Sequence, residues 1–377
     1  MLTTPSQSQS AQLPGTDHLT RRLVAGPRRA AAAVLITAML AGAVQLGLAA
    51  FSVSASGTAV DLHDTAALEH TLEGKIPARQ NLVGLVNALR FRLLGGTSDQ
   101  VRLGTDGWIY LKAELLPRPE ASQSIQTRAA AVVRLQRQLA ARGTRLLIAV
   151  SPDKTRIEAA HLRGGLPGGF PVNGYQQFQS LLRAAHVDTV DLATPLAAAG
   201  GERYYRTDTH WNNRGAGLAA QAIGQALSSW NIQGGQEFVT RPTGPEQERP
   251  GDLLRLMGLE HVPDGWRPPA DHEVPVQTTE LGTSSAGLLG AGDAVVLVGS
   301  SYCLRGNFQG ALEQALRHTV INAAREGADY AGSLREYLAD PAFAAAPPSV
   351  LIWEIPERFL APTPGPQDLL PDIATSP

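Results

Sequence analysis

One stretch of the chain organises the interpretation of the rest: Tyr204-Tyr205-Arg206-Thr207-Asp208-Thr209-His210-Trp211-Asn212-Asn213-Arg214-Gly215. Asp208 and His210 stand two residues apart in it. In an extended segment such a pair points to the same side, with the two Cα atoms about 7 Å apart. The carboxylate can then accept the Nδ1–H of the imidazole, which leaves Nε2 free to take a proton from another group. A strand end with a satisfied histidine and a capping aspartate is the alternative interpretation.

A candidate nucleophile lies further along the chain. The apolar run 293–299, bounded by glycine, is typical of a buried parallel strand. Ser300-Ser301-Tyr302-Cys303 follows it, and the spacing of apolar residues predicts a helix over 307–317. A serine at such a strand-to-helix turn is exposed at the carboxyl edge of a sheet, beside a helix N-terminus that favours developing negative charge. A turn of small residues with a helix cap is the alternative.

The two motifs together resemble a known family. Arg206-Thr-Asp-Thr-His-Trp211 with Gly215, followed by a strand that ends in Gly299-Ser-Ser-Tyr302, is similar to the alginate O-acetyltransferase family AlgJ/AlgX, SGNH hydrolase-like proteins of bacterial exopolysaccharide export. These two motifs are the specific part of the resemblance. Weaker segments match in the same order within roughly residues 74–360, and they are Val101–Leu111, Leu146–Lys154, Gly251–Leu253 and Ile352–Arg358.

The resemblance implies a catalytic triad. In it Ser301 is the nucleophile, His210 the general base, and Asp208 the group that orients the histidine. No cofactor and no metal are implied. One departure from the family pattern is Cys303, where another small or aromatic residue is expected. Possible oxyanion or substrate contacts are expected from Ser300, Tyr302, Asn307, Arg206, Trp211 and Lys154, although a solvated side chain is the simpler expectation for the lysine.

The alternation of strand and helix patterns predicts an α/β fold. We expect a three-layer SGNH hydrolase-like domain, in which helices cover both faces of a parallel sheet. Strands are expected over residues 108–111, 145–150, 187–192, 293–299 and 350–355. Helices are expected over residues 127–142, 175–185, 215–230, 307–317 and 330–338.

The chain is expected to divide into five segments. These are a cytoplasmic polar tail (1–29), a transmembrane signal anchor (30–55), a linker with a helix (56–100), the acetyltransferase domain (101–361) and a loose tail (362–377). Proline and glycine interrupt the domain at about 231–292, which predicts an insertion that could wall the substrate groove. Within it, Gly251-Asp252-Leu253 could lend a group to the site. Asp271-His272-Glu273 is expected to be a solvated loop between prolines, with a metal site as the alternative.

The N-terminal region predicts a membrane anchor. No side chain from Ala30 to Val60 is charged, and residues 30–51 are mostly apolar. At about 1.5 Å per residue this run can cross a bilayer of roughly 30 Å. Four preceding arginines predict a single-pass protein of the inner membrane, with its catalytic part in the periplasm. A signal peptide cut near Ser52–Ala55 is the competing interpretation.

Composition limits the remaining possibilities. The 377 residues, 43% hydrophobic and 18% charged, suffice for one large α/β domain with an appendage. A net charge of −2 gives no basic surface at the level of the whole chain, which argues against nucleic acid as a partner. A single cysteine excludes an internal disulfide framework and a multi-cysteine zinc site.

The resemblance implies a polysaccharide O-acetyltransferase. Ser301 would carry the acetyl group as acetyl-serine, with the oxyanion held by backbone N–H groups, before a sugar hydroxyl takes it. The implied partners are a polysaccharide acceptor and a membrane-bound O-acyltransferase that delivers acetyl groups. AlgX-type members carry a C-terminal carbohydrate-binding domain, for which the residues after the expected acetyltransferase domain are too few, so we expect the chain to resemble the AlgJ type more. A carbohydrate acetylesterase with the same triad, a non-catalytic glycan-binding component and Cys303 as the nucleophile remain alternatives.

Overall fold

The computed structural model describes residues 44, 79–95, 98–166, 173–232, 234–282 and 294–373. The chain divides into two compact units, Met1–Gly96 with His261–Arg267 and Thr97–Glu260 with Pro268–Pro377. The smaller unit contains helix α3 (Arg79–Leu94), in the segment for which the sequence predicts a helix. Apart from Val44, the predicted polar tail and membrane anchor lie outside the described residues. Among the residues that are described, no helix combines the length and the apolar character that crossing a membrane needs.

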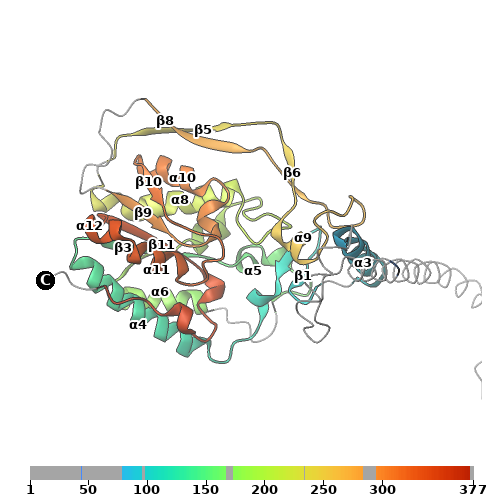
Figure 1. The fold of residues 1–377 in the computed structure, drawn as a ribbon, viewed down its shortest axis with the longest axis horizontal. Helices are drawn as coiled ribbons and strands as arrows, with labels where there is room; N and C mark the ends of the chain where they lie inside the picture. The colour runs from blue at the N-terminus through green and yellow to red at the C-terminus, as the bar shows by residue number, and fades with distance from the viewer. Residues whose placement is uncertain are drawn as a thin grey trace, which may run out of the picture. The chain divides into compact units, whose positions relative to one another are not determined.

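A five-stranded parallel sheet is the centre of the larger unit, with the strand order β10-β9-β11-β3-β4 (Figure 1). β11 therefore lies between the two halves of the sheet, next to β3 and β9. β9 and β11 are buried at every position, which explains why their sequences are almost entirely apolar. The strands are β3 (Arg145–Ser151), β4 (Asp188–Val190), β9 (Val295–Val298), β10 (Val320–Asn322) and β11 (Val350–Pro356).

Helices cover both faces of this sheet (Figure 1). One face carries α4 (Ala121–Ala140), α6 (Gly174–Ala184), α11 (Gly332–Ala339) and α12 (Pro341–Ala345). The other carries α8 (Asn213–Leu227) and α10 (Phe308–Leu316), which pack against each other. The α/β fold with a parallel sheet that the sequence predicts is thereby confirmed.

The remaining elements of the larger unit are short. β1 (Val101–Leu103) and β2 (Ile109–Leu111) form an antiparallel pair. α5 (Lys154–Ile157) and α7 (Ala193–Ala198) are single turns or little more. The 3-10 helices are η1 (Lys112–Leu115), η2 (Ala159–His161), η3 (Ser228–Trp230), η4 (Ser301–Leu304), η5 (Glu357–Phe359) and η6 (Pro366–Asp368).

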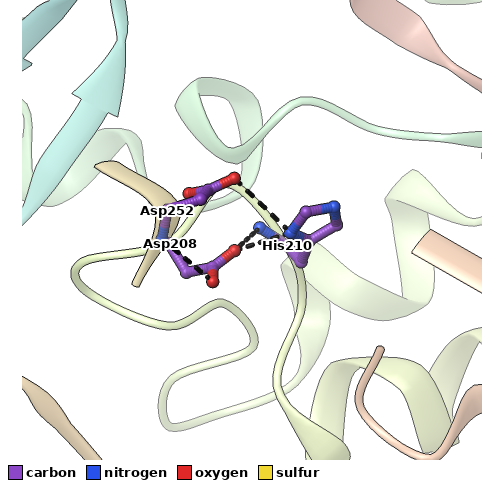
Figure 2. Close-up of side chains that lie close together, drawn as sticks. All are labelled: Asp208, His210 and Asp252. Carbon is purple, nitrogen blue, oxygen red and sulfur yellow. Dashed lines mark hydrogen bonds and ion pairs between the residues drawn. The ribbon is translucent and has the colours of Figure 1, made fainter. Parts of the chain in front are cut away.

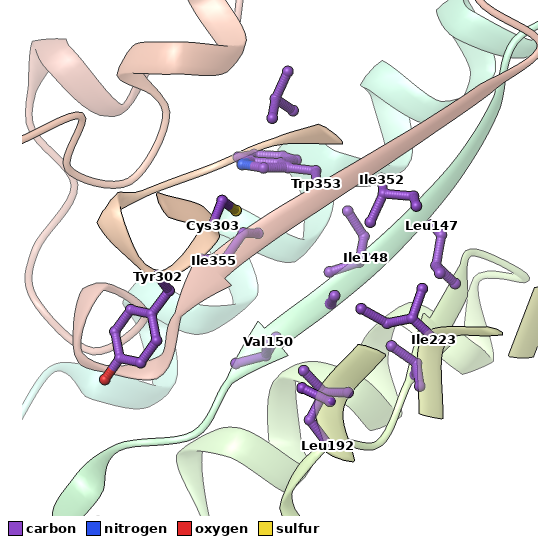
Figure 3. Close-up of a cluster of buried hydrophobic side chains, with 14 of the residues drawn as sticks. Leu147, Ile148, Val150, Leu192, Ile223, Tyr302, Cys303, Ile352, Trp353 and Ile355 are labelled. Carbon is purple, nitrogen blue, oxygen red and sulfur yellow. The ribbon is translucent and has the colours of Figure 1, made fainter. Parts of the chain in front are cut away.

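The core forms where β3 and β11 lie side by side (Figure 3). Successive residues of a strand face opposite layers, so both strands carry apolar side chains on both faces. Full burial of such a side chain stabilises the fold by about 1.5–3 kcal/mol. One residue breaks the apolar pattern of β11: Glu354, which is completely buried. The labelled core residues include Leu147, Ile148, Val150, Ile352, Trp353, Ile355, Leu192 and Ile223.

The predicted insertion lies outside the central sheet and has its own strands. β5 (Glu237–Pro242) pairs with β8 (Val276–Leu281), and β6 (Gln247–Arg249) pairs with β7 (Asp271–Glu273), both antiparallel. Helix α9 (Asp252–Leu256) follows β6 directly. The expectation of a solvated loop at 271–273 was wrong, because these residues form β7. The carboxylates of Asp271 and Glu273 accept hydrogen bonds from residues 205–207, in the loop that carries His210 and is called the histidine loop below.

The C-terminal tail is also more ordered than the sequence suggests. The Arg128 guanidinium of α4 donates hydrogen bonds to the carbonyls of Leu360 and Pro362 at 3.1 and 2.5 Å. It also forms an ion pair with Asp368 at 2.8 Å. The expectation of a loose tail was therefore wrong for residues 362–368, because a buried arginine of the core binds Pro362 and Asp368 at the two ends of this segment.

Candidate active site

Three side chains from two distant segments meet at the carboxyl edge of the sheet. Asp208 Oδ1 lies 2.6 Å from His210 Nδ1, and His210 Nε2 lies 2.7 Å from Ser301 Oγ. A neutral imidazole satisfies both contacts when Nδ1 carries the proton and Nε2 accepts the serine hydroxyl. The structure thus joins the three residues that the sequence selects into one hydrogen-bonded chain.

The loop before α8 fixes the aspartate and the histidine. An isolated antiparallel bridge pairs Tyr204 with Trp211 at its ends. Inside the loop, the backbone N–H of His210 also donates to Asp208 Oδ1, at 2.9 Å. The Asn212 side chain then caps α8 by accepting from the N–H of Gly215 at 3.0 Å. A Cβ at that glycine would stand 2.2 Å from a backbone carbonyl oxygen, so only glycine fits.

The candidate nucleophile begins 3-10 helix η4, directly after Ser300. Ser300 is buried, and its Oγ accepts from the N–H of Tyr302 at 3.2 Å. Its own N–H and hydroxyl both donate to Oε2 of Glu354, each at 2.8 Å. Within the described part of the chain no hydrogen bond uses the N–H of Ser301, which leaves this donor available at the turn. The predicted contact Ser300 therefore shapes the turn instead of facing the pocket.

Two aromatic residues brace the histidine loop against the serine turn. Trp211 Nε1 donates to the carbonyl of Tyr302 at 3.1 Å, and the Tyr302 hydroxyl donates to the carbonyl of Thr209 at 2.8 Å. Both rings are fully buried, with centroids 4.9 Å apart. The structure therefore places these two expected substrate contacts in the core, where they keep His210 at a fixed distance from Ser301.

Lys154 is also placed in the core. Its side chain is completely buried, and its Nζ donates to the carbonyls of Ile109, Arg206 and Asp208 at 2.5, 2.8 and 3.0 Å. Burial lowers the pKa of the lysine to about 8, although nearby carboxylates oppose this effect. The expectation of a solvated lysine was wrong, because the three carbonyls replace water as hydrogen-bond partners. Lys154 fastens the backbone of the aspartate that holds the histidine.

The last two expected contacts also lie elsewhere. The half-exposed guanidinium of Arg206 forms an ion pair with Glu202. Asn307, with a left-handed backbone, donates from its side chain to the hydroxyl of Thr278 in β8 at 2.9 Å. None of the six residues predicted as oxyanion or substrate contacts is among those that line the cavity at the triad.

A polar cavity of about 370 Å³ opens at Ser301 and His210. The insertion supplies half of its lining, and the segments after β9 and β10 supply much of the rest. Three arginines lie in the wall, and none of them was predicted, although they flank the Gly-Asp-Leu and Ser-Ser segments that were. The lining residues are Asp208, His210, Arg249, Pro250, Gly251, Asp252, Arg255, Glu260, Ser301, Arg305, Glu326 and Gly327.

Two charged side chains of the insertion reach the Asp208–His210 pair. Arg249 Nη1 donates to Asp208 Oδ2 at 3.0 Å. Asp252 Oδ2 lies 3.7 Å from His210 Nδ1, so that two carboxylates point toward the imidazole (Figure 2). Burial alone would raise the pKa of Asp208, but hydrogen bonds and charge from His210, together with the Arg249 cation, lower it far below its usual range.

The same cluster has the composition of a weak metal site. Ligand atoms of Asp208, His210 and Asp252 lie within 4.8 Å of one another. However, His210 Nδ1 is bonded to Asp208, the second Asp208 oxygen is bonded to Arg249, and both Asp252 oxygens accept hydrogen bonds from Thr209. A cation would have to displace these bonds and lie next to a guanidinium. The contacts therefore fit an oriented histidine better than a metal centre.

Comparisons with known proteins support the same chemistry. The sequence model of a family described as SGNH hydrolase-like domain, acetyltransferase AlgX, matches residues 101–357. A protein named "Probable alginate O-acetylase AlgJ" from Pseudomonas aeruginosa is 34% identical over 344 residues, 85% of this chain and 87% of that protein. Its namesake in Pseudomonas syringae pv. tomato is 34% identical over 322 residues, 82% of each chain.

A solved structure is similar as well. The O-acetyltransferase domain of Pseudomonas putida AlgJ matches with a TM-score of 0.61 and 34% identity. The match covers 69% of this chain and 92% of that domain. The range that the family model matches, residues 101–357, contains the central sheet and all the residues that line the cavity.

Proposed function

Because the chain belongs to the family of SGNH hydrolase-like acetyltransferases that contains AlgX, we propose that Ser301, His210 and Asp208 transfer acetyl groups onto hydroxyls of an exported polysaccharide. The resemblance to the AlgJ/AlgX family, and to its AlgJ type, is confirmed by the matches to AlgJ over most of the chain. The protein is thus a polysaccharide O-acetyltransferase. The roles of the individual residues, the acceptor and the donor partner are our proposals.

One observation carries the assignment of roles: the chain of hydrogen bonds from Asp208 through His210 to Ser301, which ends in an open cavity. His210 Nε2 takes the proton of Ser301 Oγ as this oxygen attacks the acetyl carbonyl. The N–H of Ser301 is placed to hold the oxyanion of the tetrahedral intermediate, an interaction worth about 3 kcal/mol for one such donor. The proton then passes to the leaving oxygen of the donor, and acetyl-serine remains.

The second half of the reaction uses the same residues, with acetyl-serine now the group that is attacked and Ser301 Oγ the leaving oxygen. A sugar hydroxyl enters the cavity and gives its proton to His210 Nε2 while its oxygen attacks acetyl-serine. Collapse of the second tetrahedral intermediate forms the sugar acetate, breaks the bond to Ser301 Oγ and returns the proton to that oxygen. If water takes the place of the sugar, the product is acetate, so acceptor binding separates a transferase from an esterase.

The acceptor that we propose is an alginate-like, acidic exopolysaccharide. The relatives are named for alginate, and a uronate chain carries a carboxylate on each sugar. Three arginines lie in the cavity wall: Arg249 and Arg305 are paired with acidic side chains, whereas Arg255 makes no ion pair with any described residue. A guanidinium without an internal partner binds carboxylates well, because its planar donors can engage both oxygens.

The location and the partner are proposed from the sequence. We infer that residues 30–55 anchor the chain in the inner membrane and that residues 101–361 form the catalytic domain in the periplasm. Acetyl-CoA is cytoplasmic, so a membrane-bound O-acyltransferase would deliver the acetyl group. The apolar run and the arginines before it support this arrangement.

An acetyl adduct tests the proposal. We would incubate the protein with a small acetyl ester, measure the intact mass and map the adduct. We expect acetyl on Ser301, none in Ser301→Ala, and faster loss to a uronate oligosaccharide than to water. Cys303→Ser should retain the adduct, because burial raises the pKa of this thiol and keeps the sulfur away from the cavity. Loss to water alone would indicate an esterase, and glycan binding without any adduct would indicate a binding component.

A further inference from the structure

The carboxylate of Asp208, next to His210, is itself paired with the guanidinium of Arg249. Arg249 Nη1 binds the second oxygen of Asp208 at 3.0 Å, in a pair whose side chains are 23% and 6% exposed. The guanidinium also lies 3.8 Å from the centre of the Tyr205 ring, and its Nε lies 3.8 Å from Glu273. The arginine is therefore held in place from several sides, and it offsets the charge of Asp208 at hydrogen-bonding distance.

A second carboxylate lies on the same side of the imidazole. Asp252 accepts from the N–H and the hydroxyl of Thr209 at 2.8 and 2.5 Å, and its Oδ2 is 3.7 Å from His210 Nδ1. Its own N–H donates to Asp208 Oδ2 at 3.3 Å. The side chain is fixed by these bonds and points at the ring without a direct hydrogen bond to it (Figure 2).

From this geometry we propose that Asp252 is a positioning residue that supplies the net negative charge for protonated His210, while Arg249 offsets the charge of Asp208. The inference rests on the proposed function, because the imidazole becomes positive only during proton transfer from an attacking hydroxyl. Asp208 sets the tautomer and the orientation of the ring. The charge that stabilises the imidazolium then comes from Asp252, on the insertion.

The negative charge of Asp252 matters during the steps in which His210 is protonated. As the bond from Ser301 Oγ to the acetyl carbon forms, the proton moves to His210 Nε2, and the ring becomes an imidazolium next to Asp252. When the donor oxygen leaves, it takes that proton and the ring is neutral again. The same cycle occurs when a sugar hydroxyl attacks, so the carboxylate assists both halves of the reaction.

Other charged groups around the ring are farther away or already paired. Tyr302, whose ring centre lies 4.9 Å from that of His210, is neutral because burial raises its pKa well above the usual range. Burial and the charge of Asp208 raise the pKa of Asp252, which remains the nearest carboxylate not bound to an arginine. The remaining charged groups near the pair are Lys154, Arg255, Glu260, Glu273, Arg305 and Glu326.

The test is the pH dependence of acetyl-enzyme formation from an aryl acetate, measured with the full chain. Asp252→Asn keeps the size of the side chain and removes its charge. Protonation of the ring then becomes less favourable. The acid limb of the profile, in which the rate falls as the pH is lowered, should therefore move to lower pH by about one unit, and the maximal rate should fall about tenfold.

Arg249→Gln should move the acid limb in the opposite direction. It leaves Asp208 without its cation, so the ring protonates more readily and the acid limb should move to higher pH. Arg249→Lys retains the charge and should leave the limb within a few tenths of a pH unit of the wild type. In the double variant Asp252→Asn/Arg249→Gln, the two displacements should largely cancel.

A purely structural role predicts a different pattern. Both single variants would then lower the melting temperature and the rate without moving the limb, or would move it in the same direction, and either result overturns the inference. If Asp252→Asn does not fold, Arg249→Gln alone decides, since an unmoved limb in a folded variant contradicts the charge balance. Failure of the proposed function is distinguishable, because the wild type would then form no acetyl adduct on Ser301.

Discussion

Glu354, in the central strand, accepts hydrogen bonds on one oxygen from both the N–H and the hydroxyl of Ser300, each at 2.8 Å. The glutamate stands beside Ala149 in the parallel register, within an otherwise apolar strand. A Cβ at Gly299 would lie 2.7 Å from the same oxygen, so the turn passes directly over the carboxylate. The residue before the candidate nucleophile is thus fixed from inside the sheet.

We expect Glu354→Ala to lower the rate of acetyl-adduct formation at least tenfold, because two buried donors lose their acceptor. The unpaired donors should lower the free energy of unfolding by about 1–3 kcal/mol each. Glu354→Gln keeps an acceptor oxygen and should retain more activity. Adduct formation followed by intact mass, with chemical denaturation of the same samples, separates the two effects. Equal rates in all three proteins would show that the turn does not need this contact.

The same carboxyl group gives a pH dependence with a definite sign. Burial raises the pKa of Glu354 above its usual 4.5, although hydrogen bonds from Ser300 oppose this effect. Above that pH the folded chain therefore binds more protons than the unfolded chain, and the free energy of unfolding falls as pH rises toward the folded pKa. Glu354→Gln should abolish this part of the decline in denaturation curves recorded from pH 4.5 upward. A decline as steep as that of the wild type would contradict it.

Lys154→Met should destabilise the fold by about 2–4 kcal/mol, because the carbonyls of three segments lose a shared donor. Burial lowers the lysine pKa from 10.5 to about 8, so between these values the unfolded chain binds more protons and the group makes the free energy of unfolding rise with pH. The variant should lose this rise. The exposed Lys112 provides the matched control, since Lys112→Met should change neither the stability nor its pH dependence.

Gly251→Ala should reduce both stability and activity. A Cβ at this glycine would meet the carbonyl oxygen of Thr207 at 2.1 Å and the nitrogen of Asp208 at 2.6 Å, so the insertion would be pushed from the histidine loop. Gly217, in α8, is the contrasting case, because nothing lies within 4 Å of its added Cβ. Gly217→Ala should stabilise the helix by up to about 1 kcal/mol. Melting temperatures that move in opposite directions are the expected result, and equal shifts would count against a tight fit at Gly251.

Arg255→Gln should raise the KM for a uronate oligosaccharide about tenfold, since a charged hydrogen bond contributes about 1.5–3 kcal/mol. The loss should shrink at high salt and be absent for a neutral oligosaccharide. Arg241, exposed in β5 and away from the cavity, serves as the control. Equal losses with charged and neutral acceptors would remove the basis for an acidic acceptor.

Much of the fold follows from local patterns. The sequence predicts strands over 145–150 and 350–355, and each observed strand extends one residue further. Both segments are mostly apolar, as expected of a strand that is buried on two faces. β10 was not predicted, because it spans three residues and has only one buried position. The helix predicted from residue 127 begins at Ala121, since its first turn has no side-chain cap to mark it.

The residues of the site could be predicted only where they lie close together in the sequence. The Asp-x-His pair and the serine turn are each encoded by neighbouring residues, and the sequence therefore selects all three members of the hydrogen-bonded chain. Of the partners that the insertion supplies, Asp252 lies in the Gly-Asp-Leu segment that was expected to lend a group to the site. Arg249 was not predicted, because it lies 41 residues from the aspartate that it contacts. Lys154 was misjudged for a related reason. Lysine is almost always exposed, and the three carbonyls that bury this one come from 45 to 54 residues away.

The position of β11 has a consequence for how the protein forms during synthesis. The strand occupies the middle of the sheet and yet begins at Val350. Until it emerges from the ribosome or a translocation channel, β3–β4 and β9–β10 are half-sheets with unpaired edges, and such edges are prone to aggregation. Pairing over this sequence distance is slow. Since the same strand carries Glu354 beneath the serine turn, a nascent chain should be catalytically silent until nearly all of it has been made.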